Sequence, residues 1–236
     1  MIRYVLFDLD GTLLPMDQDI FVKAYFKELS KKMAPYGYTA DGLVDGIWKS
    51  MGAMVANDGS RTNDTVFWEN FSKVLGNDVL SRRPIFDEFY RNEFNNVSKH
   101  CGFTPKAQET VDLIKGLGAK IVIATLPVFP ADAIEARINW AGVNKDDLEY
   151  YTSYEKCSFT KPSPDYYKEL LAKIDARPEE CLMVGNNVDE DMIASTLGMK
   201  VFLLTDCLIN EHDADISVYP HGSWNKLQEH IREILA

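Results

Sequence analysis

The sequence contains few cysteines and histidines, and neither type is arranged as a metal site. The four cysteines are far apart and form no Cys-x-x-Cys pair, and the four histidines show no ligand spacing. This arrangement argues against a structural zinc centre. The chain also shows no internal repeat and no low-complexity segment.

Long apolar runs and a basic leader are missing as well. No stretch of the sequence approaches the length needed to cross a bilayer. The first apolar segment starts almost at Met1, which leaves no room for the basic part of a signal peptide. We therefore expect a reduced, soluble, cytoplasmic protein with no membrane partner.

Positive charge is in deficit, with 25 lysines and arginines against 36 acidic residues and a net charge of −11. This charge argues against nucleic acid as a main partner, but a locally positive site could still take a small anionic substrate.

At 236 residues and 46% hydrophobic content, the chain has the size and composition of one large or two modest globular domains. The sequence leaves the oligomeric state open.

The hydrophobic pattern divides the chain into three stretches. A strand-like segment (4–7) comes first, and residues 17–103 then show apolar side chains almost entirely at helical spacing. After residue 104 the pattern alternates, with strands expected at 120–124, 181–184 and 200–204 and helices at 107–117, 164–174 and 189–196. Short apolar strands that alternate with helices predict an α/β fold with a parallel sheet covered on both faces.

Asp8 and Asp10 are the most informative residues of the chain. They lie two positions apart at the end of the first apolar segment, and Gly11 follows them. In a strand such residues point to the same side, and the glycine lets the chain turn sharply. Two adjacent acids raise each other's pKa unless a cation lies between them, so the pair predicts a metal ion. The alternative is that both aspartates only cap a turn.

Two further polar residues occur where a phosphate could be bound. Thr125 follows the strand expected at 120–124, so its hydroxyl could donate to a phosphate oxygen, although it could also be an ordinary β-branched strand end. Lys161 precedes Pro162 and Pro164, which predict a helix start. A fixed cation there would relieve the repulsion between a phosphoryl group and an attacking carboxylate. The alternative is a solvated loop lysine.

The segment Asp8–Thr12 (DLDGT) resembles the first signature of the haloacid dehalogenase-like (HAD) superfamily, most of whose members are phosphatases. Thr125, Lys161 and the segment 184–191 are similar to the second, third and fourth signatures, in that order. The resemblance implies a parallel-sheet, Rossmann-like core and a helical cap inserted between the first two signatures. The core would comprise residues 1–15 and 104–236, and the cap residues 16–103.

The resemblance also implies roles for these residues. Asp8 would attack the phosphorus atom, Asp10 would protonate the leaving group, and Thr125 and Lys161 would hold the phosphoryl oxygens.

The cofactor implied is Mg²⁺. Its implied ligands are Asp8, Asp10, Asn187 and Asp191.

The chain departs from the family pattern at two positions. Asn187 stands where the family has an acid, so it keeps an oxygen ligand but not the charge, and we expect weaker magnesium binding. Leu126 stands where the family often has a polar residue, and it could contact substrate only through its backbone. In the expected cap, Arg61 is the best candidate to read an anionic leaving group, although an ordinary surface turn would explain it equally well.

The sequence therefore predicts magnesium-dependent hydrolysis of a small phosphorylated metabolite, a phosphomonoester, through an aspartyl-phosphate. A dehalogenase is less favoured because a halide leaves without a proton, so Asp10 would have no task. No feature favours a mutase or a phosphonate hydrolase. Asn187 and Leu126 motivate another alternative, a catalytically weakened phosphate-binding or regulatory protein. The identity of the phosphomonoester cannot be predicted from the sequence.

Overall fold

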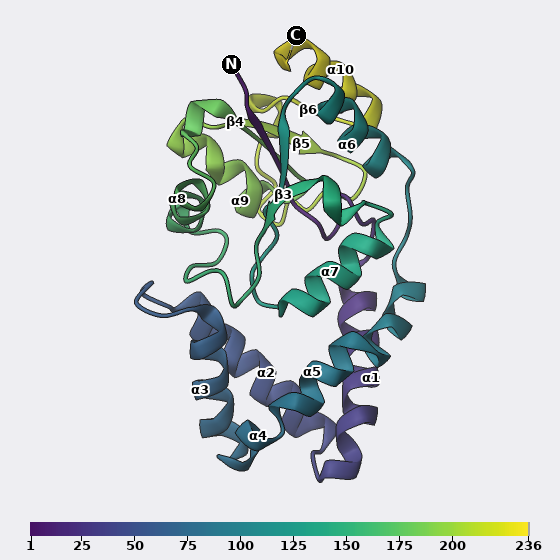
Figure 1. Ribbon diagram of the computed structural model, residues 1–236, viewed down its shortest axis with the longest axis vertical. Helices are drawn as coiled ribbons and strands as arrows, with labels where there is room; N and C mark the ends of the chain where they lie inside the picture. The colour runs from purple at the N-terminus through teal and green to yellow at the C-terminus, as the bar shows by residue number, and fades with distance from the viewer. Residues whose placement is uncertain (236) are drawn as a thin grey trace.

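A parallel sheet of six strands forms one end of the molecule, where both chain termini also lie (Figure 1). The computed structural model describes residues 1–235. The strands are β1 (Tyr4–Phe7), β2 (Lys120–Ile123), β3 (Leu148–Tyr151), β4 (Cys181–Gly185), β5 (Lys200–Leu204) and β6 (His221–Gly222). Their order across the sheet is β3-β2-β1-β4-β5-β6, and every neighbouring pair is parallel.

Helices account for much of the remaining chain. The α-helices are α1 (Gln18–Met33), α2 (Ala40–Val55), α3 (Asn63–Leu75), α4 (Asp78–Ser81), α5 (Arg83–Arg91), α6 (Lys106–Gly116), α7 (Ala131–Trp140), α8 (Pro164–Lys173), α9 (Val188–Asp191) and α10 (Trp224–Leu235). Short 3₁₀ segments are η1 (Ala34–Tyr36), η2 (Glu93–His100), η3 (Lys145–Asp147), η4 (Pro178–Glu180), η5 (Met192–Leu197) and η6 (Ile216–Val218).

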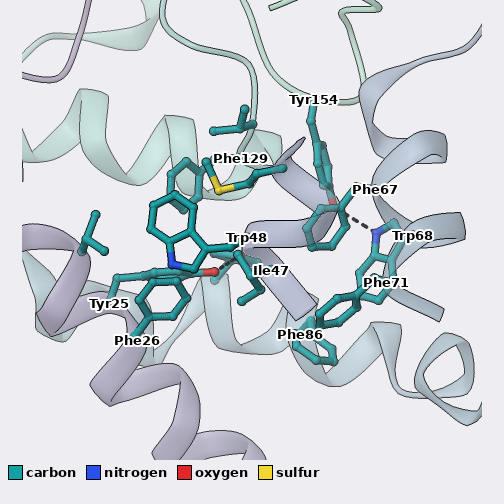
Figure 2. Close-up of a pocket in the computed structure, with 14 residues that line it drawn as sticks. Tyr25, Phe26, Ile47, Trp48, Phe67, Trp68, Phe71, Phe86, Phe129 and Tyr154 are labelled. Atoms are coloured by element: carbon teal, nitrogen blue, oxygen red, sulfur yellow. Dashed lines mark hydrogen bonds between the residues drawn. The ribbon is translucent and has the colours of Figure 1, made fainter. Parts of the chain in front are cut away.

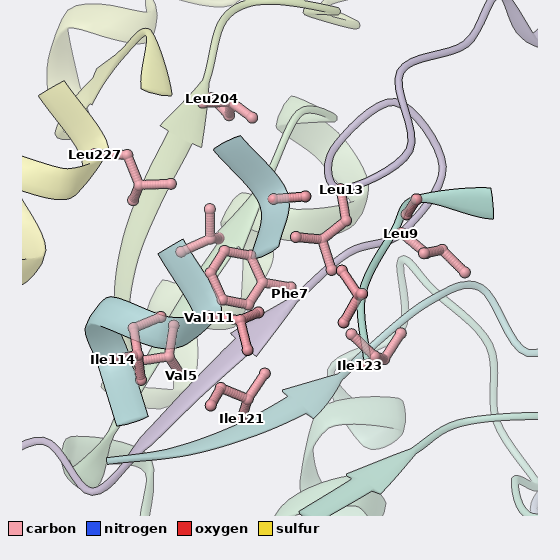
Figure 3. Packing of buried hydrophobic residues seen from close by; sticks show 14 of the residues in the cluster. Val5, Phe7, Leu9, Leu13, Val111, Ile114, Ile121, Ile123, Leu204 and Leu227 are labelled. Atoms are coloured by element: carbon pink, nitrogen blue, oxygen red, sulfur yellow. The ribbon is translucent and has the colours of Figure 1, made fainter. Parts of the chain in front are cut away.

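The central strand β1 is buried on both faces and separates two hydrophobic cores. Val5 and Phe7 point into one core, which side chains of α6, α7 and α10 complete (Figure 3). Tyr4 and Leu6 point into the other core, against α8 and α9. This alternation is the period of two that a strand imposes on its side chains. The predicted α/β fold, with a parallel sheet covered on both faces, is confirmed.

A helical region is inserted between β1 and β2, as predicted, and lies at the opposite end of the molecule from the termini (Figure 1). Its three longest helices each begin at a side-chain cap. Asp17, Thr39 and Thr62 accept hydrogen bonds from backbone N–H groups of the first turns of α1, α2 and α3. The region has its own aromatic core, which Ala133 of α7 joins. Helix α7 thus lies between the sheet and the inserted helices.

The two connections between the sheet region and the inserted helices lie side by side, at Pro15 and Gly102. The backbone N–H of Gly102 donates to the carbonyl oxygen of Pro15 at 2.6 Å. A Cβ on Gly102 would lie 3.0 Å from the Pro15 ring, so the two connections are in close contact.

The structure departs from the predicted elements in a few places. The helix expected at 189–196 is split into α9 and η5, while α6 and α8 lie within a residue or two of their predicted bounds. Strands β3 and β6 were not predicted, because β3 is a half-exposed edge strand and β6 has two residues. Helix α7 was not predicted either.

Within residues 1–235, the helices are too short or too polar to cross a membrane.

Candidate active site

The carboxyl ends of β1, β2 and β4 bring the predicted site residues to one edge of the sheet. Phe7, the last residue of β1, is paired with Ile123 of β2 and with Val184 of β4. Asp8 follows directly, and its backbone N–H donates to the carbonyl of Val184 at 2.9 Å. Because β1 is flanked by strands that continue the sheet in opposite directions, this edge is a topological switch point, where open α/β sheets bind their ligands.

A cavity of about 230 Å³ opens at this edge and extends under the inserted helices. Its sheet-side wall consists of Asp8, Asp10, Thr125, Leu126, Asn186, Asn187 and Glu190. The facing wall comes mostly from α1, α2 and the loop after β2, and it is largely apolar. The structure therefore brings most of the predicted site residues to one cavity.

Asp8 is held by Lys161, which lies just before α8. The ammonium nitrogen is 2.8 Å from Oδ1 of Asp8 and 2.6 Å from Oδ1 of Asp191, and its side chain is fully buried. Burial alone would lower the pKa of Lys161, but the carboxylates of Asp191 and Asp8 hold that pKa well above its usual value. Burial raises the pKa of Asp191 to about 6. Lys161 is thus a permanent cation fixed between two acids.

Asp10 has a cation of its own, Arg137 of α7, which the sequence did not reveal. Nη1 of Arg137 donates to Oδ2 of Asp10, and the guanidinium carbon lies 4.4 Å from the ring centroid of Phe129. Oδ1 of Asp10 is buried without a hydrogen-bond partner. Burial raises the pKa of Asp10, Arg137 lowers it, and the nearby Asp8 raises it; the net effect is an increase. Asp10 can therefore hold a proton at a higher pH than an ordinary aspartate.

Two glycines allow the acidic loops to approach each other. Gly11 has a φ of +85°, and a Cβ there would lie 2.4 Å from Nδ2 of Asn186. Gly185 ends β4, and a Cβ on it would lie 2.0 Å from Oδ2 of Asp191. Asp191 can reach Lys161 only because position 185 carries no side chain.

The two asparagines after β4 have different surroundings. Oδ1 of Asn187 accepts from the backbone N–H groups of Asp189 and Glu190, so this side chain caps α9. Asn186 is connected to Asp8 through the hydroxyl of Thr12. This hydroxyl lies 2.9 Å from Oδ1 of Asn186 and 3.3 Å from Oδ2 of Asp8. Asn187 would have to weaken its helix cap to bind a metal ion through the same oxygen.

Glu190 is a cavity residue that was not predicted for the site. It lies in α9 and lines the cavity. Burial and the neighbouring Asp191 and Asp8 raise its pKa to about 7, although Lys161 opposes them. The run of three acids at 189–191, which begins four positions after the end of β4, was the available signal for a residue of this kind.

Thr125 and Leu126 line the cavity in the loop that follows β2. The carbonyl of Thr125 accepts from the hydroxyls of Thr152 at 2.8 Å and Tyr166 at 2.9 Å, which fixes the backbone at this point. The carbonyl of Leu126 accepts from the N–H of Val128, which closes a tight turn.

The structure does not bring Arg61 to this cavity. Arg61 is paired with Glu69 on the surface of the inserted region, and it lines a separate depression together with Asp58. Its loop does reach the sheet region, through Asn63, whose Nδ2 lies 3.2 Å from the carbonyl oxygen of Phe159. The expectation that Arg61 reads a leaving group has no support in this position, because its charge is used locally.

The donors around Asp8 fit a magnesium ion in type and in charge. No group of three or more His, Cys, Asp or Glu side chains within residues 1–235 is arranged as a metal cluster. However, three carboxylates (Asp8, Asp10 and Asp191) are paired with Lys161 and Arg137, and Glu190 lines the cavity beside them, so negative charge is in excess when all four are ionised. Magnesium keeps several waters and is often held by one or two carboxylates, so Asp8 and Asp191 suffice in number.

The chain belongs to the haloacid dehalogenase-like hydrolases, because the model of that family matches residues 2–195. It is similar to the pyrophosphatase PpaX of Bacillus cereus (strain G9842), with 24% identity over 84% of this chain and 81% of the relative.

Solved structures share the fold. The 2-haloacid dehalogenase from Pseudomonas syringae pv. Tomato DC3000 matches with a TM-score of 0.63 and 19% identity, over all of both chains. The HAD phosphatase from Thermococcus onnurineus matches with a TM-score of 0.58 and 17% identity, over 100% of this chain and 98% of that one. At these identities the likeness shows the fold, and both phosphatases and dehalogenases have it.

Proposed function

We propose that this hydrolase is a magnesium-dependent phosphatase that cleaves a small phosphomonoester through an aspartyl-phosphate on Asp8. The observation that carries the proposal is the contact between Asp8 and Lys161 in a cavity that also holds Asp10. Lys161 fixes the carboxylate of Asp8 and offsets its repulsion of the incoming phosphoryl group. Backbone N–H groups near Thr125 and the Thr125 hydroxyl would hold the phosphoryl oxygens.

Asp10 supplies and removes the proton. In the first step an oxygen of Asp8 bonds to phosphorus, the bond to the alcohol oxygen breaks, and Asp10 gives its proton to that oxygen. In the second step Asp10 takes a proton from water as the water oxygen attacks phosphorus, and the Asp8 carboxylate leaves. The raised pKa of Asp10 suits the first step, and Arg137 stabilises the carboxylate that acts in the second.

Asp8, Asp191, the main-chain carbonyl of Asp10 and Asn187 would hold the magnesium ion, and Asn186 is a second amide within the same network. When bound, the ion supplies positive charge that offsets the charge of the phosphoryl oxygens. The amides at positions 186 and 187 add no negative charge, so we expect the magnesium requirement to be high.

We also propose that residues 1–15 and 104–236 form the catalytic core and residues 16–103 the cap. The close contact of Pro15 with Gly102 supports these boundaries, because the inserted region joins the sheet region through two adjacent connections. A cap over the cavity would exclude bulk water and select the alcohol half of the substrate.

A phosphate-binding protein without turnover is the second candidate, and the two asparagines after β4 motivate it. The raised pKa of Asp10 weighs against it, since a proton donor beside a phosphate has a use in ester cleavage. Asp10 also weighs against a dehalogenase, because a departing halide needs no proton.

The test is hydrolysis of p-nitrophenyl phosphate with and without magnesium, in the wild type and in Asp8→Asn. We expect magnesium-dependent turnover in the wild type and its loss in Asp8→Asn, with an unchanged circular dichroism spectrum. A folded Asp8→Asn variant with near wild-type turnover would refute the nucleophile. Release of chloride from 2-chloropropionate without phosphatase activity would identify a dehalogenase.

A further inference from the structure

We infer that the alcohol half of the substrate is apolar, an aryl or alkyl group that lies against Trp48, Met51 and Phe129, and that it carries no second anionic group. This inference rests on the proposed phosphatase function and deepens it, because it names the class of substrate that the site takes.

The cavity wall opposite the acidic residues supports an apolar ligand. Phe21 and Val22 of α1, Trp48 and Met51 of α2, and Phe129 after β2 all face it. Gln18 is the polar side chain on this side, and no lysine, arginine or histidine among residues 1–235 lines the cavity. Arg137, the nearest arginine in the site, is buried, stacked on Phe129 and paired with Asp10. An anionic leaving group would therefore lose its water without gaining a cation.

The exposure of Trp48 is the strongest evidence for an apolar ligand at this wall. Its side chain is 48% exposed, whereas its neighbours on the buried side of α2, Leu43 and Ile47, are within the aromatic core. A large aromatic side chain that is left open at the mouth of a cavity is typical of a ligand contact.

The apolar wall continues into a second cavity of about 60 Å³ within the inserted helices (Figure 2). The two cavities share Trp48, Met51 and Phe129 in their walls. Four of the polar side chains in the second cavity are paired with each other. The hydroxyls of Tyr25 and Tyr90 lie 2.8 Å apart, and Nε1 of Trp68 donates to the hydroxyl of Tyr154 at 3.3 Å.

These pairings leave ring faces and edges as the main surface of the second cavity, as Figure 2 shows for the labelled side chains around Trp48. An aryl or alkyl group attached to a phosphate at Asp8 would extend from the acidic cavity along this surface. Such a group would bury apolar area without displacing water from a charged partner.

The chain's likeness to a pyrophosphatase sets up the opposite expectation, since the second phosphate of pyrophosphate is an anion. The experiment compares kcat/KM for n-hexyl phosphate, glycerol 2-phosphate and pyrophosphate, in magnesium. The first two are both alkyl monoesters without a second anionic group, and their alcohols differ in polarity and in apolar area. We expect n-hexyl phosphate to be preferred over both others by about ten-fold or more. An equal or reversed preference would overturn the inference while leaving the phosphatase proposal intact.

Variants at Trp48 test whether this side chain causes the preference for n-hexyl phosphate. Trp48→Leu keeps an apolar wall and should retain most of the preference, whereas Trp48→Arg adds a cation and should shift the preference toward pyrophosphate. Because Trp48 is half-exposed, both variants should fold. Phe103→Ala, at an exposed aromatic outside both cavities, is the matched control and should change nothing. Identical preferences in Trp48→Leu and Trp48→Arg would contradict the placement.

A binding measurement separates this inference from the proposed function. Calorimetry with n-hexylphosphonate and methylphosphonate needs no turnover, and the hexyl compound should bind the wild type about ten-fold more tightly or better. If no ester is hydrolysed, the proposed function fails, and this comparison still decides whether the cavity binds an apolar group next to a phosphate-like anion. Equal binding of the two phosphonates, or binding of neither, would overturn it.

Discussion

At the scale of single residues, Asp8 and Asp10 are each paired with a different cation. Asp8 shares Lys161 with Asp191, while Asp10 is paired with Arg137. Two adjacent carboxylates would otherwise raise each other's pKa, and the sequence alone suggested a metal ion as the remedy. The structure shows that protein side chains supply part of that compensation. The two cations approach from different elements, so the two acids are held independently.

The proton-transfer role of Asp10 predicts a dependence on the leaving group. Asp10→Asn should slow an alkyl phosphate by about 10²–10⁴-fold, the usual worth of general acid catalysis. An aryl phosphate departs with little protonation, so its first step should lose much less. Pre-steady-state release of the alcohol or phenol measures this step for both esters. Equal losses for the two would contradict the assignment of Asp10 as the acid.

Asn187 predicts a weak magnesium site that can be strengthened. Asn187→Asp adds a charge beside the ion, worth ~1–3 kcal/mol for a partly desolvated pair. The magnesium concentration for half activation should then fall roughly ten-fold or more. Aspartate also caps helices, so α9 should be preserved. Asn186→Asp is an informative comparison, because an aspartate cannot donate to the carbonyl of Cys207 as Asn186 does.

Magnesium titration of the wild type and both variants, with one aryl phosphate, decides this point. Identical curves for the wild type and Asn187→Asp would mean that Asn187 is not a ligand. A magnesium requirement that falls only in Asn186→Asp would move the ligand to the neighbouring residue. Activity that appears only in a variant would favour the phosphate-binding alternative for the wild type.

At the scale of elements, short strands position the proposed catalytic residues, so the anchoring of β1 matters. The N–H of Arg3 donates to the carbonyl of Glu180 at 2.8 Å, and the Glu180 carboxylate accepts from Arg3 and Arg177. The hydrogen bonds from Arg177, through its side chain and its backbone N–H, lower the pKa of Glu180 to about 2. Glu180 thus connects the start of β1 to the start of β4.

This connection predicts a specific pH dependence of stability. Because the pKa of Glu180 is lower in the folded state than in the unfolded chain, its contribution is complete above about pH 4.5 and is lost as pH falls toward 2. Glu180→Gln should therefore be less stable than the wild type at pH 7, and the difference should shrink between pH 5 and pH 2. Urea unfolding at several pH values measures it. A deficit that does not change with pH would mean that the ionised carboxylate is not responsible.

The sequence predicted those elements that are buried on both sides. β1, β2, β4 and β5 are short apolar runs, and such runs show a parallel sheet plainly. β3 lies at the sheet edge with half-exposed side chains, so its pattern is ambiguous. Lys161 was recognisable because prolines fix its position before α8.

Arg137 was not recognisable from the sequence. An arginine on a helix normally lies in solvent, and the packing of α7 against Phe21 and Phe129 buries this one. Its partner Asp10 is 127 positions away in the chain, a separation that no local pattern bridges. The amide network around Asn186 depends in the same way on a close approach of two loops.

At the scale of the whole molecule, the helical region contacts the sheet region at several points around the cavity. Besides the adjacent connections at Pro15 and Gly102, the start of α3 is bound to the sheet region, where the N–H of Asn63 donates to the carbonyl of Cys157 at 2.8 Å. The walls of the cavity therefore come from both regions: acids from the sheet edge and apolar side chains from the helices. In the function proposed above, the chemistry and the choice of substrate therefore depend on different parts of the chain.

The central claim is that Asp8 carries the phosphoryl group during turnover, and one experiment tests it directly. Asp10→Asn is mixed with an aryl phosphate and magnesium, so that the aspartyl-phosphate forms but its hydrolysis is slowed. Borohydride then reduces an acyl-phosphate to an alcohol, and peptide mass spectrometry locates the change. We predict homoserine at position 8 and at no other aspartate. Rapid release of the phenol with an unmodified Asp8 would contradict covalent catalysis by this residue.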